Sequence, residues 1–95
     1  MNEHDIQREA VKVLRDKGYR VIVTSNNRRV RSATRGLPDV LVAVGRGLWV
    51  GLEFKAQKGA LTEEQTRLMR EGNIHVCRSS VEALAAIQFA ERQLR

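Results

Sequence analysis

Asp39, Glu53 and Lys55 are the residues whose types and spacing best suit chemistry. They flank Gly45-Arg46-Gly47, a stretch that is typical of a three-residue β-hairpin turn. Counting outward from this turn places Asp39 directly opposite Glu53. Two like charges that face each other across a strand pair destabilise a sheet, so such a pair either shares a proton or holds a cation. The pattern therefore indicates a divalent metal site.

Lys55 adds a third chemical group to this pair. It follows Glu53 by two residues, so its side chain projects from the same face, about 6–7 Å further along the strand. An ammonium group there could orient or deprotonate a water molecule that attacks a phosphate. Each feature alone has an ordinary interpretation, because a Glu-x-Lys on an edge strand and an Asp that starts a strand after Pro38 are both common. Their combination on one hairpin favours the metal site.

The hairpin that positions these residues is predicted as two strands, 39–44 and 48–55. Val44 is expected opposite Leu48. Because side chains alternate between the two faces of a strand, one face of the hairpin is apolar and the other carries the acids and the lysine. The apolar face comprises Val40, Val42, Val44, Leu48, Val50, Leu52 and Phe54.

Hydrophobic spacing predicts the remaining elements. Ile6, Ala10, Val13 and Leu14 form the buried stripe of a first helix, which Gly18 ends. The rest of the chain reads as a strand at 19–24, a helix that begins at Thr62, a strand at 74–77, and a helix at 79–92 with a capping box at Ser79–Glu82. The order α-β-β-β-α-β-α predicts one α/β domain over residues 1–95, with a mixed central sheet flanked by helices.

Basic residues are concentrated in the segment Ser25–Gly36. It has almost no apolar residues and holds four arginines, Arg28, Arg29, Arg31 and Arg35. Guanidinium groups match phosphate oxygens in two-point hydrogen bonds, and the chain carries a formal net charge of +6. We therefore expect a loop that grips nucleic-acid phosphates, with a solvated connecting loop as the plain alternative.

Composition excludes several other classes of protein. An apolar fraction of 42% argues against a disordered chain. No apolar run reaches the roughly 18–20 residues that span a bilayer, and the polar start resembles no secretion signal, so no membrane partner is expected. The single cysteine, Cys77, lies in an apolar stretch, which favours a core position in a protein of the reducing cytoplasm. Nothing predicts a nucleotide cofactor.

Four ordered segments resemble the PD-(D/E)xK nuclease superfamily and, within it, the VRR-NUC (virus-type replication-repair nuclease) domain. The resemblance covers most of the chain, from Glu3 to about Ala83, and the chain is little more than the bare domain, as in stand-alone phage and prophage members. The segments are Gly36-Leu37-Pro38-Asp39, Glu53-Phe54-Lys55, Lys58-Gly59-Ala60-Leu61-Thr62-Glu63-Glu64-Gln65 and Arg78-Ser79-Ser80-Val81-Glu82-Ala83. The resemblance implies a restriction-endonuclease-like core.

The resemblance also implies ligands and a catalytic lysine. Asp39 and Glu53 would bind Mg²⁺ or Mn²⁺, with the backbone carbonyl of Phe54 as a further ligand. Lys55 would serve the attacking water. Phe54 replaces the usual small aliphatic residue, and its side chain is expected on the apolar face, where the change is harmless.

Two further residues depend on the resemblance. Gln65 matches the family's helix glutamine, which implies a catalytic or substrate-contact role; the alternative is a capping box with Thr62. The family also places a glutamate on the first helix near the metal. Glu3, which is spaced to lie on the buried stripe, is preferred as a metal ligand, and Glu9 remains a second candidate.

Taken together, these features predict a metal-dependent DNA endonuclease in the cytoplasm of a bacterium or a phage-infected cell. We expect it to select branched or four-way-junction (Holliday junction) DNA by structure rather than by sequence, because phosphate contacts position a protein without reading bases. The basic loop and Lys58 would hold the backbone, and a homodimer would place two cuts. The alternative is a non-catalytic DNA-binding module on a nuclease-like scaffold, and an RNA substrate is left open.

Overall fold

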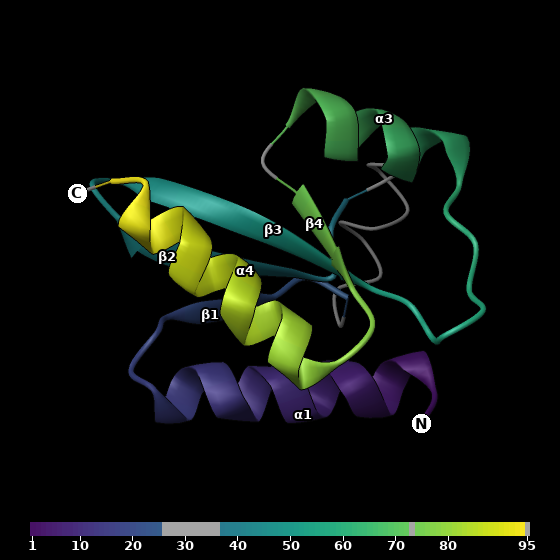
Figure 1. The fold of residues 1–95 in the computed structure, drawn as a ribbon, viewed down its shortest axis with the longest axis horizontal. Helices are drawn as coiled ribbons and strands as arrows, with labels where there is room; N and C mark the ends of the chain where they lie inside the picture. The colour runs from purple at the N-terminus through teal and green to yellow at the C-terminus, as the bar shows by residue number, and fades with distance from the viewer. Residues whose placement is uncertain (26–36, 73, 95) are drawn as a thin grey trace.

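Four strands form one mixed sheet in the computed structural model, which describes residues 1–25, 37–72 and 74–94 (Figure 1). The strand order is β1-β2-β3-β4, with antiparallel pairing from β1 to β3 and a parallel β3–β4 pair. The elements are α1 (Glu3–Asp16), β1 (Val21–Val23), β2 (Val40–Gly45), β3 (Leu48–Phe54), α3 (Glu63–Glu71), β4 (Ile74–Cys77) and α4 (Ser80–Arg92). This confirms the predicted α-β-β-β-α-β-α order of an α/β fold with flanking helices.

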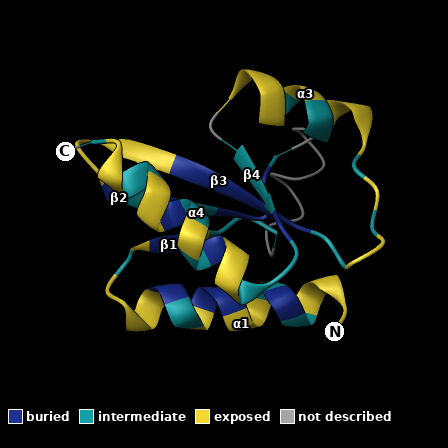
Figure 2. Cartoon of the chain, viewed as in Figure 1, coloured by how far each residue is buried: buried dark blue, intermediate teal, exposed yellow. Residues whose placement is uncertain are grey.

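The core lies between the sheet and the helix pair α1 and α4 (Figure 2). Val40, Val42, Val50, Leu52 and Phe54 of the hairpin are almost fully buried, as their alternation predicts. They pack with the buried faces of the two helices, which comprise Ile6, Ala10, Val11, Leu14, Ala83 and Ile87. Helix α3 instead contacts β4 and has no fully buried residue. Polar contacts therefore matter more for the anchorage of α3 than for α1 and α4.

The register of the β2–β3 hairpin agrees with the prediction except beside the turn. Val40 pairs with Leu52 and Val42 with Val50, but Gly45, rather than Val44, lies opposite Leu48. The turn contains three consecutive residues with positive φ, at 45–47, and the register shifts there. Leu48 was expected on the buried face, but it is 48% exposed because it follows the shifted turn.

Helix termini largely follow the sequence signals. Gly18, with φ +95°, ends α1, and Thr62 and Gln65 form the complete capping box of α3. At α4 the capping box is altered. Ser79 Oγ accepts a hydrogen bond from the Glu82 amide, but the Glu82 carboxylate accepts from the amide of Arg78, one residue before the cap. The reciprocal bond thus satisfies a different backbone donor.

Candidate active site

Two buried carboxylates mark the end of the hairpin that is remote from its turn. Asp39 directly precedes β2 and is 8% exposed, and Glu53, near the end of β3, is 4% exposed. The ladder pairs Val40 with Leu52, so one further step along it sets Asp39 opposite Glu53. Burial of two carboxylates is costly unless each is hydrogen-bonded or neutralised. This pair is therefore the strongest candidate for chemistry in the described part of the chain.

Asp39 is held by the strands on both sides of it. Its Oδ2 accepts a hydrogen bond of 2.8 Å from the Phe54 amide of β3. Its backbone carbonyl accepts bonds from the amides of Thr24 (2.9 Å) and Ser25 (3.2 Å), which follow β1. These contacts fix both the main chain and the carboxylate, so the acid is positioned before any ligand arrives.

Pro38 and Gly51 set the place where the Asp39 backbone meets the sheet. A β-carbon on Gly51 would lie 2.9 Å from Cγ of Pro38 and 3.0 Å from Cγ1 of Ile74. Real β-carbons do not approach so closely, and the absence of a side chain lets the proline ring pack directly on β3. The sequence showed Pro38 as part of a motif, but nothing in it indicated that Gly51 supports the proline.

Glu53 is connected to α3 through Gln65. Gln65 Nε2 donates a hydrogen bond of 2.6 Å to Glu53 Oε1, while Gln65 Oε1 accepts one of 3.0 Å from the Thr62 amide. The Gln65 amide in turn donates to Thr62 Oγ1 (3.1 Å). The capping and site interpretations of Gln65 are therefore compatible. Its side-chain amide completes the capping box through Oε1 and contacts Glu53 through Nε2. A substrate contact of Gln65 stays a prediction.

Lys55 follows the last residue of β3 and is half-buried. Its amide donates to the Cys77 carbonyl (3.1 Å), which continues the parallel pairing by one residue. The loop after it is held by Arg78, whose Nη1 donates to the carbonyls of Ala56 and Gln57. The sequence predicts no role for Arg78. Its position directly after a buried strand is the feature that could have indicated one.

Glu3 and Glu9, the two candidate glutamates of α1, contact different parts of the structure. Glu9 Oε1 accepts a hydrogen bond of 2.6 Å from Ser80 Oγ at the start of α4. Glu3 was expected on the buried stripe, and this was wrong: it is exposed, because it is the first residue of α1 and precedes the first buried residue, Ile6. Its Oε1 lies beside Gly59, 3.1 Å from the place of a β-carbon there, in the loop that follows Lys55.

The two carboxylates, Asp39 and Glu53, suit a hard divalent ion that takes few of its ligands from the protein. Among the described residues, no group of three or more His, Cys, Asp or Glu side chains converges to hold a metal. Mg²⁺ commonly binds one or two carboxylates and takes its other oxygens from water and substrate phosphate. Asp39 and Glu53 provide two such carboxylates, and a ligand role of the Phe54 carbonyl stays a prediction.

The cationic residues divide between described and undescribed parts of the chain. Lys58 is exposed in the loop after Lys55, so it is accessible to a polyanion. Arg28, Arg29, Arg31 and Arg35 lie outside the described residues.

Cys77 is buried, as expected of a core residue. Burial, followed by the nearby negative charge of Glu82, raises the pKa of its thiol from 9.0 to about 12. It is therefore a neutral packing group at physiological pH.

No protein-family model, curated protein or solved structure matches the chain. Over the described residues, none of the helices combines the length and the apolarity that a bilayer crossing requires. The assignment of function therefore depends on the geometry of the site.

Proposed function

We propose that this chain is a metal-dependent DNA endonuclease that hydrolyses phosphodiester bonds. The observation that supports the proposal is the burial of two carboxylates, Asp39 and Glu53, at the same end of the paired strands β2 and β3, with Lys55 two residues after Glu53. Two buried carboxylates on paired strands repel each other, and a cation between them would offset that repulsion. The resemblance to VRR-NUC nucleases names a chemistry that needs such a pair.

The residues divide the work of hydrolysis between them. Asp39 and Glu53 would hold the ion, which when bound supplies Lewis-acid stabilisation of the charge on the phosphodiester oxygens. Lys55 orients the attacking water and stabilises negative charge at the phosphorus. The water oxygen bonds to phosphorus as the bond from phosphorus to the 3′ oxygen breaks. The water gives up a proton and the departing 3′ oxygen takes one from solvent, which leaves a 5′-phosphate and a 3′-hydroxyl. Gln65 keeps Glu53 in its position during the reaction.

The proposed substrate is duplex or branched DNA, including four-way junctions. The net charge of +6 favours a polyanion, and Lys58 with the 25–36 arginines would contact phosphates. One Trp, one Tyr and two Phe are too few to support a stacking platform for single strands. We further propose that the protein acts in the cytoplasm as a homodimer, whose two active sites would cut on both sides of a junction.

Cleavage of supercoiled plasmid and of a synthetic four-way junction tests the activity. We expect nicking with Mg²⁺ or Mn²⁺, none in EDTA, and strong loss of activity in Glu53→Gln and Lys55→Ala. Lys17→Ala is the matched control, because Lys17 is an exposed lysine at the C-cap of α1. Full activity of Lys55→Ala would contradict the mechanism.

A non-catalytic DNA-binding module is the second candidate. It is favoured by the hydrogen bonds that Asp39 and Glu53 already accept from Phe54 and Gln65, and by the lack of a third acid in the described cluster. DNA binding that persists while no metal supports cleavage would establish it. Cleavage that disappears in Glu53→Gln would exclude it.

A further inference from the structure

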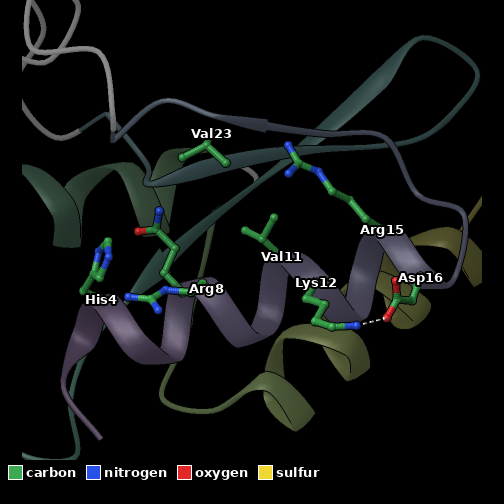
Figure 3. Close-up of a pocket in the computed structure, with 8 residues that line it drawn as sticks. His4, Arg8, Val11, Lys12, Arg15, Asp16 and Val23 are labelled. Atoms are coloured by element: carbon green, nitrogen blue, oxygen red, sulfur yellow. Dashed lines mark hydrogen bonds and ion pairs between the residues drawn. The ribbon is translucent and has the colours of Figure 1, made fainter.

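A groove between α1 and β1 lies outside the candidate active site (Figure 3). Its volume is about 420 Å³. Val11 of α1 and Val23 of β1 line it from opposite sides and make this part of the groove apolar. Arg8, Lys12 and Arg15 line it from the helix. An apolar lining beside a row of cations suits the sugar-phosphate backbone of a nucleic acid, which alternates apolar and anionic groups.

The cations form one row because of their helical spacing. Lys12 follows Arg8 by four residues and Arg15 follows Lys12 by three, so all three lie on one face of α1. At 1.5 Å per residue, the row spans about 10 Å, which is the axial length of about three phosphates on one DNA strand. The backbone positions of the three cations therefore span the axial length of several consecutive phosphates.

The counter-ions of this row are weakly held. Lys12 pairs with Asp16 at 2.8 Å and Arg8 with Asp5 at 3.9 Å, and the side chains of Lys12 and Arg8 are 77% and 72% exposed. Solvent and salt screen exposed ion pairs of this kind, so phosphates can replace them at little cost. The residues that line the groove include the cations Arg8, Lys12 and Arg15 but one carboxylate, that of Asp16.

The contacts of Arg15 argue against a peptide occupant. Its Nη2 donates a hydrogen bond of 3.0 Å to the Val21 carbonyl of β1, which is the edge strand of the sheet. A peptide that added itself as a further strand would need that acceptor. The charge of the groove also favours an anionic occupant.

The groove is continuous with the chain that positions Asp39. Gln7, which lines the groove, donates from Nε2 to Ser25 Oγ at 2.7 Å. The Ser25 amide donates to the Asp39 carbonyl at 3.2 Å. One end of the groove is thus two hydrogen bonds from the candidate acid.

We propose that the α1–β1 groove binds the backbone of the DNA that extends beyond the cleavage position, with phosphates on Arg8, Lys12 and Arg15 and sugars on Val11 and Val23. This inference depends on DNA being the partner in the proposed function, but it does not depend on cleavage. It assigns α1 a second role, because the same helix buries Ile6, Ala10 and Leu14 in the core.

Salt-dependent DNA binding in EDTA tests the groove without any cleavage. The double variant Arg8→Ala/Lys12→Ala is compared with Lys17→Ala/Arg92→Ala, which removes the same charge from exposed positions outside the groove. Loss of two phosphate contacts should reduce the slope of log K against log[salt] by about 1.8. Between 50 and 200 mM salt, the affinity of the groove variant should fall about 12-fold less than that of wild type.

The outcomes separate this inference from the nuclease proposal. Equal slopes for the two double variants would overturn the groove, even if the wild type cleaves DNA. A reduced slope confined to the groove variant supports it, even if no metal gives cleavage. Equal thermal midpoints of the two variants control for loss of folding.

Site-specific crosslinking gives a second readout. A photoreactive group on Lys12→Cys should crosslink to bound DNA, and the same group on Arg92→Cys should not. Cys77 is buried, so the introduced thiol is the reactive one. Equal crosslinking at both positions would contradict the groove.

Discussion

The contact between Gln65 and Glu53 allows a test that separates helix capping from support of the site. Gln65→Ala removes the hydrogen bond to the buried acid and half of the capping box. Thr62→Ala removes only capping contacts, because Thr62 Oγ1 accepts from the Gln65 amide. Both variants weaken the start of α3, so their difference isolates the bond to Glu53.

The expected magnitudes follow from the two kinds of bond. Loss of an N-cap hydroxyl costs about 1 kcal/mol of unfolding free energy. A hydrogen bond to a charged group contributes about 1.5–3 kcal/mol, and Glu53 is only 4% exposed, so water replaces the lost donor poorly. We expect Gln65→Ala to lose about 2.5–4 kcal/mol and Thr62→Ala about 1 kcal/mol.

Urea denaturation in EDTA measures both free energies without interference from a metal. Cleavage assays on the same proteins then compare function: Thr62→Ala should retain activity, and Gln65→Ala should lose most of it. Destabilisation that differs by less than about 0.5 kcal/mol between the variants would refute the reasoning, since the smallest expected contribution of a charged hydrogen bond is larger.

Three further predictions concern the acids and the thiol. Asp39→Asn should stabilise the metal-free protein by about 0.5–1 kcal/mol, because it removes like-charge repulsion while the amide oxygen still accepts from Phe54; a clear loss of stability in EDTA melts would contradict the register. Mg²⁺ at about 100 times its dissociation constant should stabilise the wild type by about 2.7 kcal/mol and leave Glu53→Gln nearly unchanged, as thermal melts can measure. The pKa of Cys77 is raised to about 12 in the folded state, so its contribution to stability is complete below pH 9 and declines as pH rises towards 12. Cys77→Ala should therefore lose less stability than wild type over that range, and identical pH profiles would contradict this.

The fold was predictable because hydrophobic alternation and cap residues dominate its elements. The faces of β2 and β3 followed from alternation, and the ends of α1 and α3 followed from Gly18 and Thr62. The exposure of Leu48 was not predictable, because a register shift depends on the backbone angles of the turn and not on residue types alone.

The acids of the site were predictable from register, whereas their supports were not. Asp39 and Glu53 followed from counting outward along the hairpin. The bond of Gln65 to Glu53 and the contacts of Arg78 join residues far apart in sequence, and only the packing of α3 and β4 brings them together. The exposed position of Glu3 reflects the start of α1, which helical periodicity does not fix.

The close packing of Pro38 against Gly51 limits which residues position 51 can accept during evolution. A β-carbon at position 51 would lie 2.9 Å from Cγ of Pro38, closer than real β-carbons come, so we expect the proline and the backbone of the neighbouring Asp39 to shift. Such a variant would keep every charged and polar group of the site but hold them at the wrong separation. A missing side chain can thus matter as much to a reaction as the side chains that perform it.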